Sequence, residues 1–368
     1  GSEALMKPPQ NPPDPRRALA HALARGDLAD QHYLGRSMAW RGEPQRLLRN
    51  GQQLITKLFR YRCEPEPYDP EVGTIARYAR GSDYHVQLKS AMQAFGESLR
   101  AQYGPKLRFR AVTDSAPVLE RHLAWQQGGG WFGRQSSLIH PDFGASSLIA
   151  ELVVDQPIEV ERKPIHPDRC GTCRSCVQVC PTEAIAPDGY RVDSRRCISF
   201  WTIEWDGMIP RWIMERMGQR IFGCDDCTVV CPWNAKAKAS VLDGLEPRPE
   251  NRRPRLLELL RYRDAAVFKT RFAGSPVLRA GPVGFCRNVL IGLASLDQNA
   301  AREAIAQFFE HDPEPMIRAT ALWAAHRQGM PITKGLADAS ALVRDLAEEL
   351  LSGVASTPPS PVVKSLHF

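Results

Sequence analysis

Two runs of closely spaced cysteines constrain this chain more than any other feature of its sequence. They read Cys170-x-x-Cys173-x-x-Cys176-x-x-x-Cys180-Pro181 and, with Cys197 lying between the runs, Cys224-x-x-Cys227-x-x-x-Cys231-Pro232. Thiolates three residues apart in a tight loop can wrap three corners of a cubane cluster. The spacing therefore predicts a bacterial-ferredoxin-like module that binds two 4Fe–4S clusters.

The same spacing assigns a ligand set to each cluster. In two-cluster ferredoxins the cysteine before proline ligates the other cluster, and Cys197 replaces the missing third member of the second run. Cluster 1 is thus predicted to take Cys170, Cys173, Cys176 and Cys231. Cluster 2 is predicted to take Cys180, Cys197, Cys224 and Cys227.

Other uses of these thiols fit the sequence less well. Disulfides need an oxidising compartment, for which there is no signal peptide. Tetrahedral zinc sites accept Cys-x-x-Cys pairs but do not use this paired register. Cys63 and Cys286 stand alone and are interpreted as small buried apolar residues.

Length and hydropathy indicate an ordinary globular chain that works without a membrane. No stretch of the 368 residues approaches the length of apolar sequence that a membrane helix needs. The expected compartment is the cytoplasm. Because clusters only move single electrons and the chain is far longer than a ferredoxin, we expect a second site with its own cofactor in the N-terminal domain.

The fold class expected is α+β in three domains. Residues 15–161 are predicted to form an α/β catalytic domain, with a helix over 84–103 and buried strands over 107–112 and 147–154. Residues 162–250 are expected to hold the clusters.

Residues 251–355 are predicted to be a basic linker followed by helices. Helical periodicity covers 285–309, 315–326 and 341–351, and the repeated spacing is typical of a short HEAT-like array. An unrelated helical bundle is the alternative. The Pro- and Ser-rich tail from Ser356 is predicted to be disordered.

Positive charge is concentrated in one part of the chain. The formal net charge is +7, and residues 195–279 carry sixteen Lys/Arg against ten Asp/Glu. Such a patch suits a polyanion such as RNA or DNA, although a solvated mixed-charge helix face would look the same. The candidate contacts are Arg248, Arg252, Arg253, Arg255, Arg261 and Arg263.

Five further stretches carry a family resemblance. They are Ile75–His85 (IARYARGSDYH), Asp114–Arg121 (DSAPVLER), Gly130–Arg134 (GWFGR), Cys197–Glu204 (CISFWTIE) and Gly223–Cys227 (GCDDC). Together they make the chain resemble the epoxyqueuosine reductases over most of its length. The resemblance implies a cobalamin enzyme with two 4Fe–4S clusters, in which electrons pass from the clusters to cobalamin. The implied reaction reduces the epoxide of epoxyqueuosine at the tRNA wobble position to give queuosine. The expected partners are that tRNA and a reductant such as a flavodoxin or ferredoxin, and the protein is expected to be a monomer.

The resemblance also implies roles for individual residues. Asp114 matches the family's proton donor, and burial against a corrin face is expected to raise its pKa. Without the resemblance, Asp114 would be interpreted as a helix N-cap. Candidate catalytic partners are Arg121, Tyr84 and His85, for which a surface ion pair or a structural histidine are the alternatives. Candidate cobalamin contacts are Arg41, Arg77, Asp114 and Trp131. Trp131 and Trp233 are also candidates for holding a flipped-out base, or for plain core residues.

Two other functions remain compatible with the cysteines. One is a reductase of a small molecule, of the reductive dehalogenase kind, which shares the cofactors but does not need the basic stretch. The other is an electron carrier without a substrate of its own, which would contain iron but no cobalt.

Overall fold

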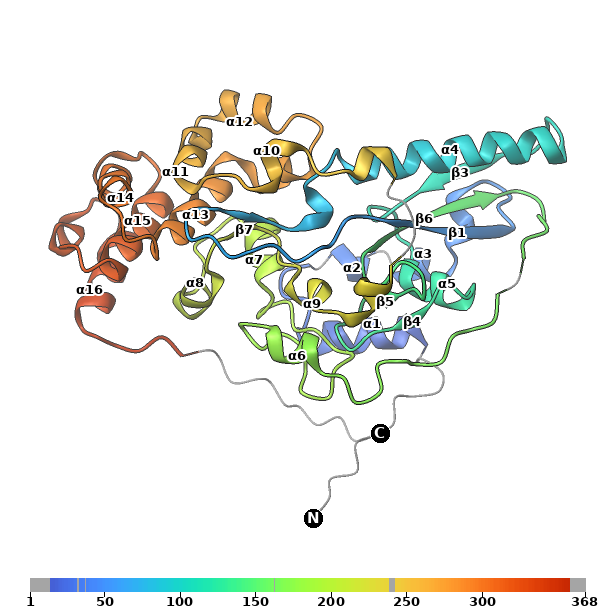
Figure 1. The fold of residues 1–368 in the computed structure, drawn as a ribbon, viewed down its shortest axis with the longest axis horizontal. Coiled ribbons are helices and arrows are strands. Elements are labelled where there is room, and N and C mark those ends of the chain that lie inside the picture. Colours follow the sequence, from blue (N-terminus) through green and yellow to red (C-terminus); the bar gives the residue numbers. More distant parts are fainter. Residues whose placement is uncertain (1–13, 32, 37, 162, 238–241, 358–368) are drawn as a thin grey trace, which may run out of the picture.

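The computed structural model describes residues 14–357 except 32, 37, 162 and 238–241. The predicted domain boundary at 162 and most of the predicted disordered tail lie outside these residues. The described chain contains both helices and strands, and all of the strands lie before residue 223, as Figure 1 shows. The mixed fold class is therefore confirmed.

The N-terminal sheet has three antiparallel strands in the order β1-β6-β3. They are β1 (Gln53–Arg60), β3 (Phe109–Val112) and the central β6 (Ser147–Val154). The predicted strands lie where expected, the first of them shortened at its start. The expectation of an α/β domain is wrong in one respect, because an α/β layer requires parallel strands. This part of the chain is α+β.

Helix α4 (Tyr84–Tyr103) covers one face of that sheet, and its bounds are those predicted. Asp83 caps it by accepting a hydrogen bond from the backbone N–H of His85. Its buried residues Leu88, Met92 and Leu99 pack with Ala150 and Leu152 of β6 in one hydrophobic cluster. Val86, at the exposed start of the predicted apolar stripe, does not join them. Helix α5 (Glu120–Gln126) covers the opposite face, where Ala124 and Trp125 pack against Ile149.

The segment with the cysteines is built from short elements. It contains α6 (Ser175–Val179), α7 (Ile198–Ile203), α8 (Arg211–Met217) and α9 (Asp226–Val229). Its strand β7 (Arg220–Phe222) pairs in parallel with β2 (Thr74–Ile75). A separate antiparallel pair, β4 (Trp131–Phe132) and β5 (Leu138–Ile139), precedes the cysteine segment in the sequence. The N-terminal helices are α1 (Pro15–Ala24), α2 (Tyr33–Arg36) and α3 (Met38–Gly42).

The C-terminal part is helical and lies at the far end of the molecule from the sheet (Figure 1). Its helices are α10 (Pro249–Arg252), α11 (Leu256–Leu259), α12 (Ala265–Arg271), α13 (Gly281–Leu293), α14 (Asn299–His311), α15 (Pro315–Arg327) and α16 (Ala341–Leu351). The amphipathic helix predicted over 285–309 is instead two helices. The first of them, α13, is buried on every side from Gly284 to Leu293.

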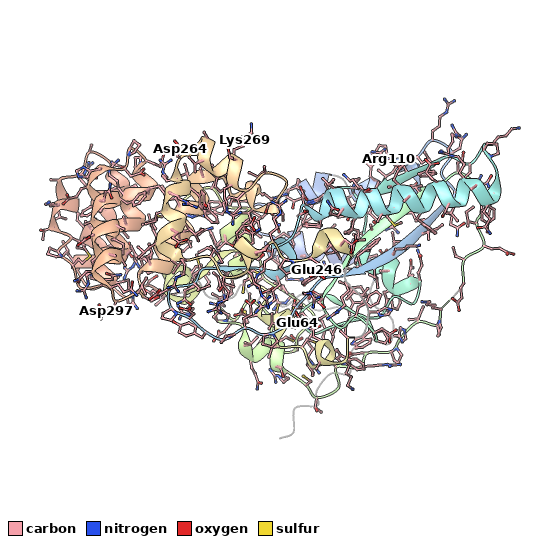
Figure 2. All side chains as sticks on the ribbon, turned by 45° about the horizontal axis from the view of Figure 1, so that its top comes forward. Glu64, Arg110, Glu246, Asp264, Lys269 and Asp297 are labelled. Atoms are coloured by element: carbon pink, nitrogen blue, oxygen red, sulfur yellow. The ribbon has the colours of Figure 1, made fainter. Side chains whose placement is uncertain are left out.

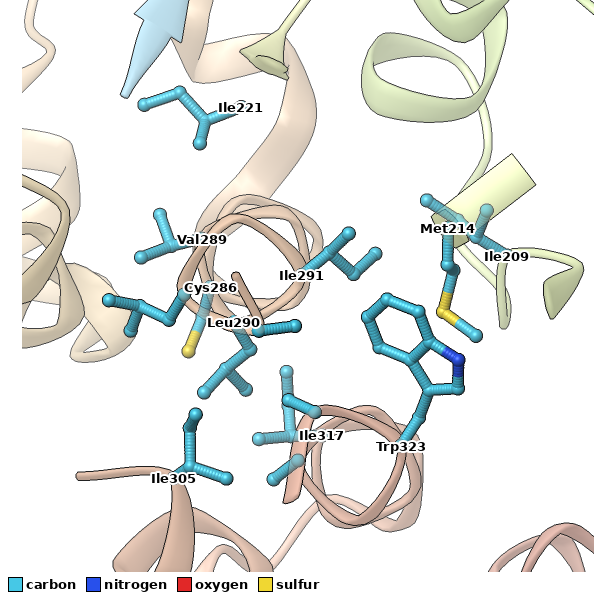
Figure 3. Packing of buried hydrophobic residues seen from close by; sticks show 14 of the residues in the cluster. Ile209, Met214, Ile221, Cys286, Val289, Leu290, Ile291, Ile305, Ile317 and Trp323 are labelled. Carbon is cyan, nitrogen blue, oxygen red and sulfur yellow. The ribbon is translucent and has the colours of Figure 1, made fainter. Parts of the chain in front are cut away.

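Helix α13 joins the C-terminal helices to the cysteine segment. Figure 3 shows residues of this helix packed between Ile305 and Ile317 on one side and Ile221 on another. The fully buried Arg287 donates hydrogen bonds to the carbonyl oxygens of Trp201 (2.7 Å) and Trp205 (3.0 Å). One hydrophobic core therefore spans both segments. Among the described residues, no helix is long and apolar enough to cross a membrane.

Candidate functional site

A cavity of about 1990 Å³ lies between the N-terminal helices, helix α5 and the cysteine segment. Typical small-molecule pockets measure about 300–1,000 Å³, so this cavity is large enough for a bulky cofactor together with part of a second ligand. Its wall includes Arg41, His85, Asp114, Glu120, Arg121 and Trp131 among the residues predicted or found near the site. Glu204 and Arg279, an ion pair at 2.6 Å, also line it.

Asp114 presents its carboxyl group to this cavity. Its side chain is 52% exposed, and its backbone has a φ of 45°, in the left-handed region that Asp and Asn tolerate better than other side chains. Tyr84 donates its hydroxyl hydrogen to Asp114 Oδ2 at 2.5 Å, and His85 Nε2 lies 3.0 Å from the same oxygen. The structure thus brings together three residues that the sequence predicted to act at one site.

The N-cap alternative for Asp114 is wrong, because α5 begins six residues later and its N-cap position is Leu119. The raised pKa is not observed either. Burial raises the pKa of Asp114, but hydrogen bonds from His85 and Tyr84 outweigh that effect and lower the pKa below its ordinary value. The same contact favours the cationic form of His85, since the hydrogen bond to Asp114 raises the pKa of His85.

His85 is held in place from both sides. Its Nδ1 lies 2.8 Å from the Asp83 carboxylate and its ring stacks on that of Tyr84. Two carboxylates on one imidazole favour the doubly protonated ring. The contacts of His85 with Asp83 and Asp114 therefore favour a protonated imidazole at the cavity wall, next to the carboxyl that faces the ligand space.

Two glutamates behind Asp114 were not predicted from the sequence. Glu120 Oε1 accepts a hydrogen bond from the backbone N–H of Asp114. Glu151, in the central strand β6, is completely buried. A signal for Glu151 was present, because it is the one charged residue in the apolar stretch Ser147–Val154. Glu120 has no such signal, since it lies in an ordinary polar sequence.

The other predicted site residues divide into two groups. Arg41 lines the cavity and donates hydrogen bonds to the carbonyl oxygens of Val118 (3.2 Å) and Leu34 (3.3 Å). Arg121 also lines it and donates to the carbonyl oxygen of Ser136. Arg121 lies on α5, whereas Asp114 precedes that helix, so the two residues do not share a helix face.

Arg77 and Trp131 have other surroundings. Arg77 is not among the residues that line the cavity; its Nη1 pairs with Asp225 at 2.9 Å, between two predicted cluster ligands. Trp131 touches the cavity but is 1% exposed and packs edge-to-face on Trp233, with ring centroids 4.7 Å apart. Trp131 is therefore mainly a core residue, and very little of its surface is exposed to the cavity.

The cavity wall has the chemistry that a corrin ring requires. Gln135 Nε2 and Ser136 Oγ are buried cavity-lining donors, and neither has a hydrogen-bond partner among the described residues. Buried polar groups are normally satisfied, and the amide groups around a corrin would satisfy these two. The residues present therefore fit a cobalamin.

The division of the cysteines into two ligand sets remains a prediction, and the neighbours of two cysteines agree with it. Burial raises the pKa of the Cys227 thiol well above its usual range, and the proximity of Cys224, Cys197 and Cys180 raises it further. In the other group, burial raises the pKa of Cys231 to about 11, and Cys176 and Cys173 act in the same direction. Cys170 packs in the apolar cluster that contains Cys231. Cys63 and Cys286 are both buried, as expected.

Within the described part of the chain, no three His, Cys, Asp or Glu side chains stand close enough to hold a single metal ion. A cubane distributes its four thiolates over four iron atoms. Its ligands therefore stand farther apart than those of one ion.

The basic stretch is largely engaged in ion pairs within the protein. Arg253 and Arg255 pair with Asp69, and Arg255 also pairs with Glu71. Arg252 lies 3.5 Å from Glu66, and Arg263 lies 3.0 Å from Asp312. Arg248 donates to backbone carbonyls, and Arg261 to the hydroxyl of Tyr262. The acidic loop of residues 64–71 thus offsets much of the charge that the sequence places here.

Comparison with protein families identifies two segments. Residues 169–234 match the 4Fe-4S double cluster binding domain, which confirms the expectation of two clusters. Residues 41–115 match the family described as Epoxyqueuosine reductase QueG, DUF1730.

Whole-chain relatives agree. The epoxyqueuosine reductase of Xanthomonas campestris is 34% identical over 84% of this chain and 87% of its own length. That of Escherichia coli is 34% identical over 81% of this chain and 79% of its own.

Solved structures extend the likeness to three dimensions. A crystal structure of epoxyqueuosine reductase with an epoxyqueuosine-modified tRNA-Tyr stem loop superposes with a TM-score of 0.82. It is 25% identical and covers 92% of this chain and 90% of that one. The fold is also shared with the Streptococcus thermophilus epoxyqueuosine reductase, at a TM-score of 0.78, 22% identity and 92% coverage of each chain. The sequence identity and its extent leave one conclusion: this chain belongs to the epoxyqueuosine reductase family.

Proposed function

We propose that this oxidoreductase reduces the epoxide of epoxyqueuosine at the wobble position of tRNA to give queuosine. The observation that carries the proposal is the Asp114 carboxyl, held by Tyr84 and His85 on the wall of a cavity of about 1990 Å³. The family's cofactors are two 4Fe–4S clusters and cobalamin. Membership of the family sets aside the dehalogenase-like reductase and the simple electron carrier.

The protein's own residues supply protons and orientation. Removing the epoxide oxygen as water consumes two electrons and two protons; the bound cofactors supply the electrons. Asp114 is proposed to give a proton to the substrate, with Tyr84 and His85 holding its carboxyl in place. Filling the cavity removes water from the exposed half of Asp114, which raises its pKa toward the protonated form that a donor needs.

The positions of Arg41, Arg121 and the unpaired donors suggest how the cavity is divided. Gln135 and Ser136 are proposed to bind corrin amides, with Trp131 closing the wall behind them. Arg41 and Arg121 are proposed to face phosphate or amide groups, since each has a guanidinium at the cavity. We do not assign Arg77 to the cofactor, because Asp225 occupies its guanidinium.

We also propose that the chain is divided into three domains. Residues 15–161 would form the cobalamin-binding and catalytic domain, 162–250 the cluster domain, and 251–355 the basic linker with HEAT-like helices. The successive packing of α14 on α15 and α15 on α16 supports the repeat. Acting on tRNA, the enzyme would work in the cytoplasm as a monomer, with a flavodoxin or ferredoxin as reductant.

The direct test is reconstitution of the full chain with iron, sulfide and cobalamin, followed by incubation with epoxyqueuosine-containing tRNA and a chemical reductant. Mass spectrometry of the nucleosides should find queuosine replacing epoxyqueuosine. Protein loaded with clusters but no cobalamin should leave the nucleoside unchanged. Reconstituted enzyme that leaves tRNA untouched while reducing a small epoxide or halide would contradict the proposal.

Reversing three exposed arginines of the basic stretch tests where tRNA binds. We expect Arg252→Glu, Arg255→Glu and Arg261→Glu together to weaken tRNA binding and to flatten its dependence on salt. Each phosphate contact contributes about 0.7–0.9 to the slope of log affinity against log salt, so three lost contacts lower the slope by roughly two to three. Titration at several salt concentrations measures both effects.

The control reverses the same number of cations elsewhere. Lys89, Lys106 and Arg110 lie on and beside α4; Figure 2 shows Arg110 beside α4 and well apart from Lys269 of α12. Their reversal should leave the slope unchanged. Equal losses in both triple variants would mean that net charge alone, not the stretch from Arg248 to Arg271, attracts the tRNA.

A further inference from the structure

The central strand of the sheet carries a carboxyl group with no evident structural partner. Glu151 is 0% exposed, and neither of its carboxyl oxygens has a well-aligned hydrogen-bond partner among the described residues. Its cross-strand neighbours are Thr56 on β1 and Val112 on β3, and neither is charged. A bare carboxylate in such a place is strongly disfavoured, so the group keeps its proton.

Glu151 faces the helix that leads to the active-site cavity. It shares a sheet face with Ile149, which packs against Ala124 and Trp125 of α5. Glu120, the first residue of α5, lies close enough to Glu151 for its carboxyl to raise the pKa of Glu151. Glu120 in turn lines the cavity and accepts the backbone N–H of Asp114. The three carboxyl groups thus run from the sheet interior to the cavity wall.

The charged groups around this series favour protons on its inner members. Asp114 raises the pKa of both glutamates, while Arg121 and His85 lower that of Glu120. Arg41 of α3 also lies near Glu120. Burial raises the pKa of Glu151, and Glu120 and Asp114 raise it further. Burial and then Asp114 also raise the pKa of Glu120. Of the three carboxyl groups, only Asp114 has a lowered pKa. Burial raises the pKa of Asp114, but the hydrogen bonds from His85 and Tyr84 outweigh that effect.

We propose that Glu151 and Glu120 form a proton reserve that refills Asp114 during the proposed reduction. Asp114 gives its proton to the substrate and becomes a carboxylate. Glu120 then passes a proton to Asp114 and takes one from Glu151, and the pair is recharged from water entering the emptied cavity. Of the two protons that each turnover consumes, one moves along this route and the other comes from solvent. The route changes no oxidation state, so the electrons come only from the enzyme's reductant. Glu151 touches no substrate and is a positioning residue in this scheme.

The inference rests on the proposed function, but its first test does not. Infrared spectra of the full chain at neutral pH, recorded without substrate in H₂O and in D₂O, should contain the C=O band of a protonated carboxylic acid. Glu151→Gln should remove that band. Thr56→Val is the matched control, because it changes the partly buried side chain directly opposite Glu151 on the same sheet face without removing a titratable proton. Absence of the band from the unmodified protein would overturn the reserve.

The second test measures proton supply in the reconstituted enzyme. Single-turnover rate constants with epoxyqueuosine-containing tRNA should be on the order of a hundredfold lower for Glu151→Gln, at the lower end of what a general acid contributes. The deficit should grow as the pH rises and free protons become scarce, while tRNA affinity and iron content stay unchanged. A Glu151→Gln profile that matches that of Thr56→Val at every pH would overturn the supply role.

Two further outcomes are also decisive. If Glu151→Gln does not fold, Glu120→Gln breaks the same series at the cavity wall, where a change of side chain is easier to accommodate, and the same two results apply to it. If the unmodified enzyme forms no queuosine, the proposed function is wrong. The infrared band alone then decides whether Glu151 and Glu120 hold a proton.

Discussion

Replacing Asp114 with Asn should abolish most queuosine formation while leaving the protein intact. Asn has the shape of Asp and tolerates the left-handed backbone found at this position, but it cannot release a proton. A general acid contributes roughly a hundred- to ten-thousandfold in rate. Nucleoside mass spectrometry after single turnover should register a loss of that size, with iron content, cobalamin binding and tRNA affinity retained.

His85 provides an internal check on the same variant. The hydrogen bond to Asp114 is the main reason that its pKa is raised, so the pKa of His85 should fall toward its ordinary value in Asp114→Asn, as measured by NMR. Asp114→Ala should lose turnover equally and also lose stability, about 1–2 kcal/mol for a left-handed alanine. Turnover close to that of the unmodified enzyme in Asp114→Asn would remove Asp114 from the mechanism.

Replacing Cys197 with Ser should remove one cluster. Burial raises the pKa of Cys197, and the proximity of Cys180 raises it further, which places these sulfurs together in the second ligand group. With a hydroxyl in place of the eighth thiolate, iron should fall from about eight atoms per chain to about four. Iron analysis and the sulfur-to-iron absorbance measure the loss, and queuosine formation should stop because electrons no longer reach the cavity.

Cys63→Ser is the matched control for this experiment. Cys63 is buried near Asp225, and burial raises the pKa of its thiol to about 12, as expected for a small apolar residue in the core. The variant should keep all of its iron, at some cost in stability. Full iron in Cys197→Ser together with partial iron in Cys63→Ser would show that the assignment of the eighth ligand is wrong.

The features that local sequence determines were predictable. Helix α4 follows from a capping Asp83 and a helical apolar period, and the cluster ligands follow from a spacing that few other sites use. The split between α13 and α14 was missed, because a helix buried on every side has no polar face to mark its limits.

The candidate site was predictable only in part, because it depends on contacts between distant segments. Arg77 pairs with Asp225, which lies 148 positions away in the sequence. The sequence around either residue does not predict that pairing. The acidic loop that offsets Arg253 and Arg255 lies even farther away along the chain, at a separation of 184 positions. Asp114 likewise owes its lowered pKa to Tyr84 and His85 on another element. Charge counted along a sequence is therefore a weak guide to charge available at a surface.

The buried Arg287 has a consequence for how a large substrate meets this enzyme. Together with Asn288, which donates to the carbonyl oxygens of Thr202 and Ile221, it fastens α13 to the cysteine segment inside one core. The C-terminal helices are therefore held at a fixed distance from the cavity and do not move toward it as a separate domain. If the proposed tRNA substrate rests on these helices, it would have to match a set spacing, and the RNA would have to bend or turn out its own nucleotide to cover the remaining distance. Selection among RNAs would then depend on how easily each anticodon loop deforms.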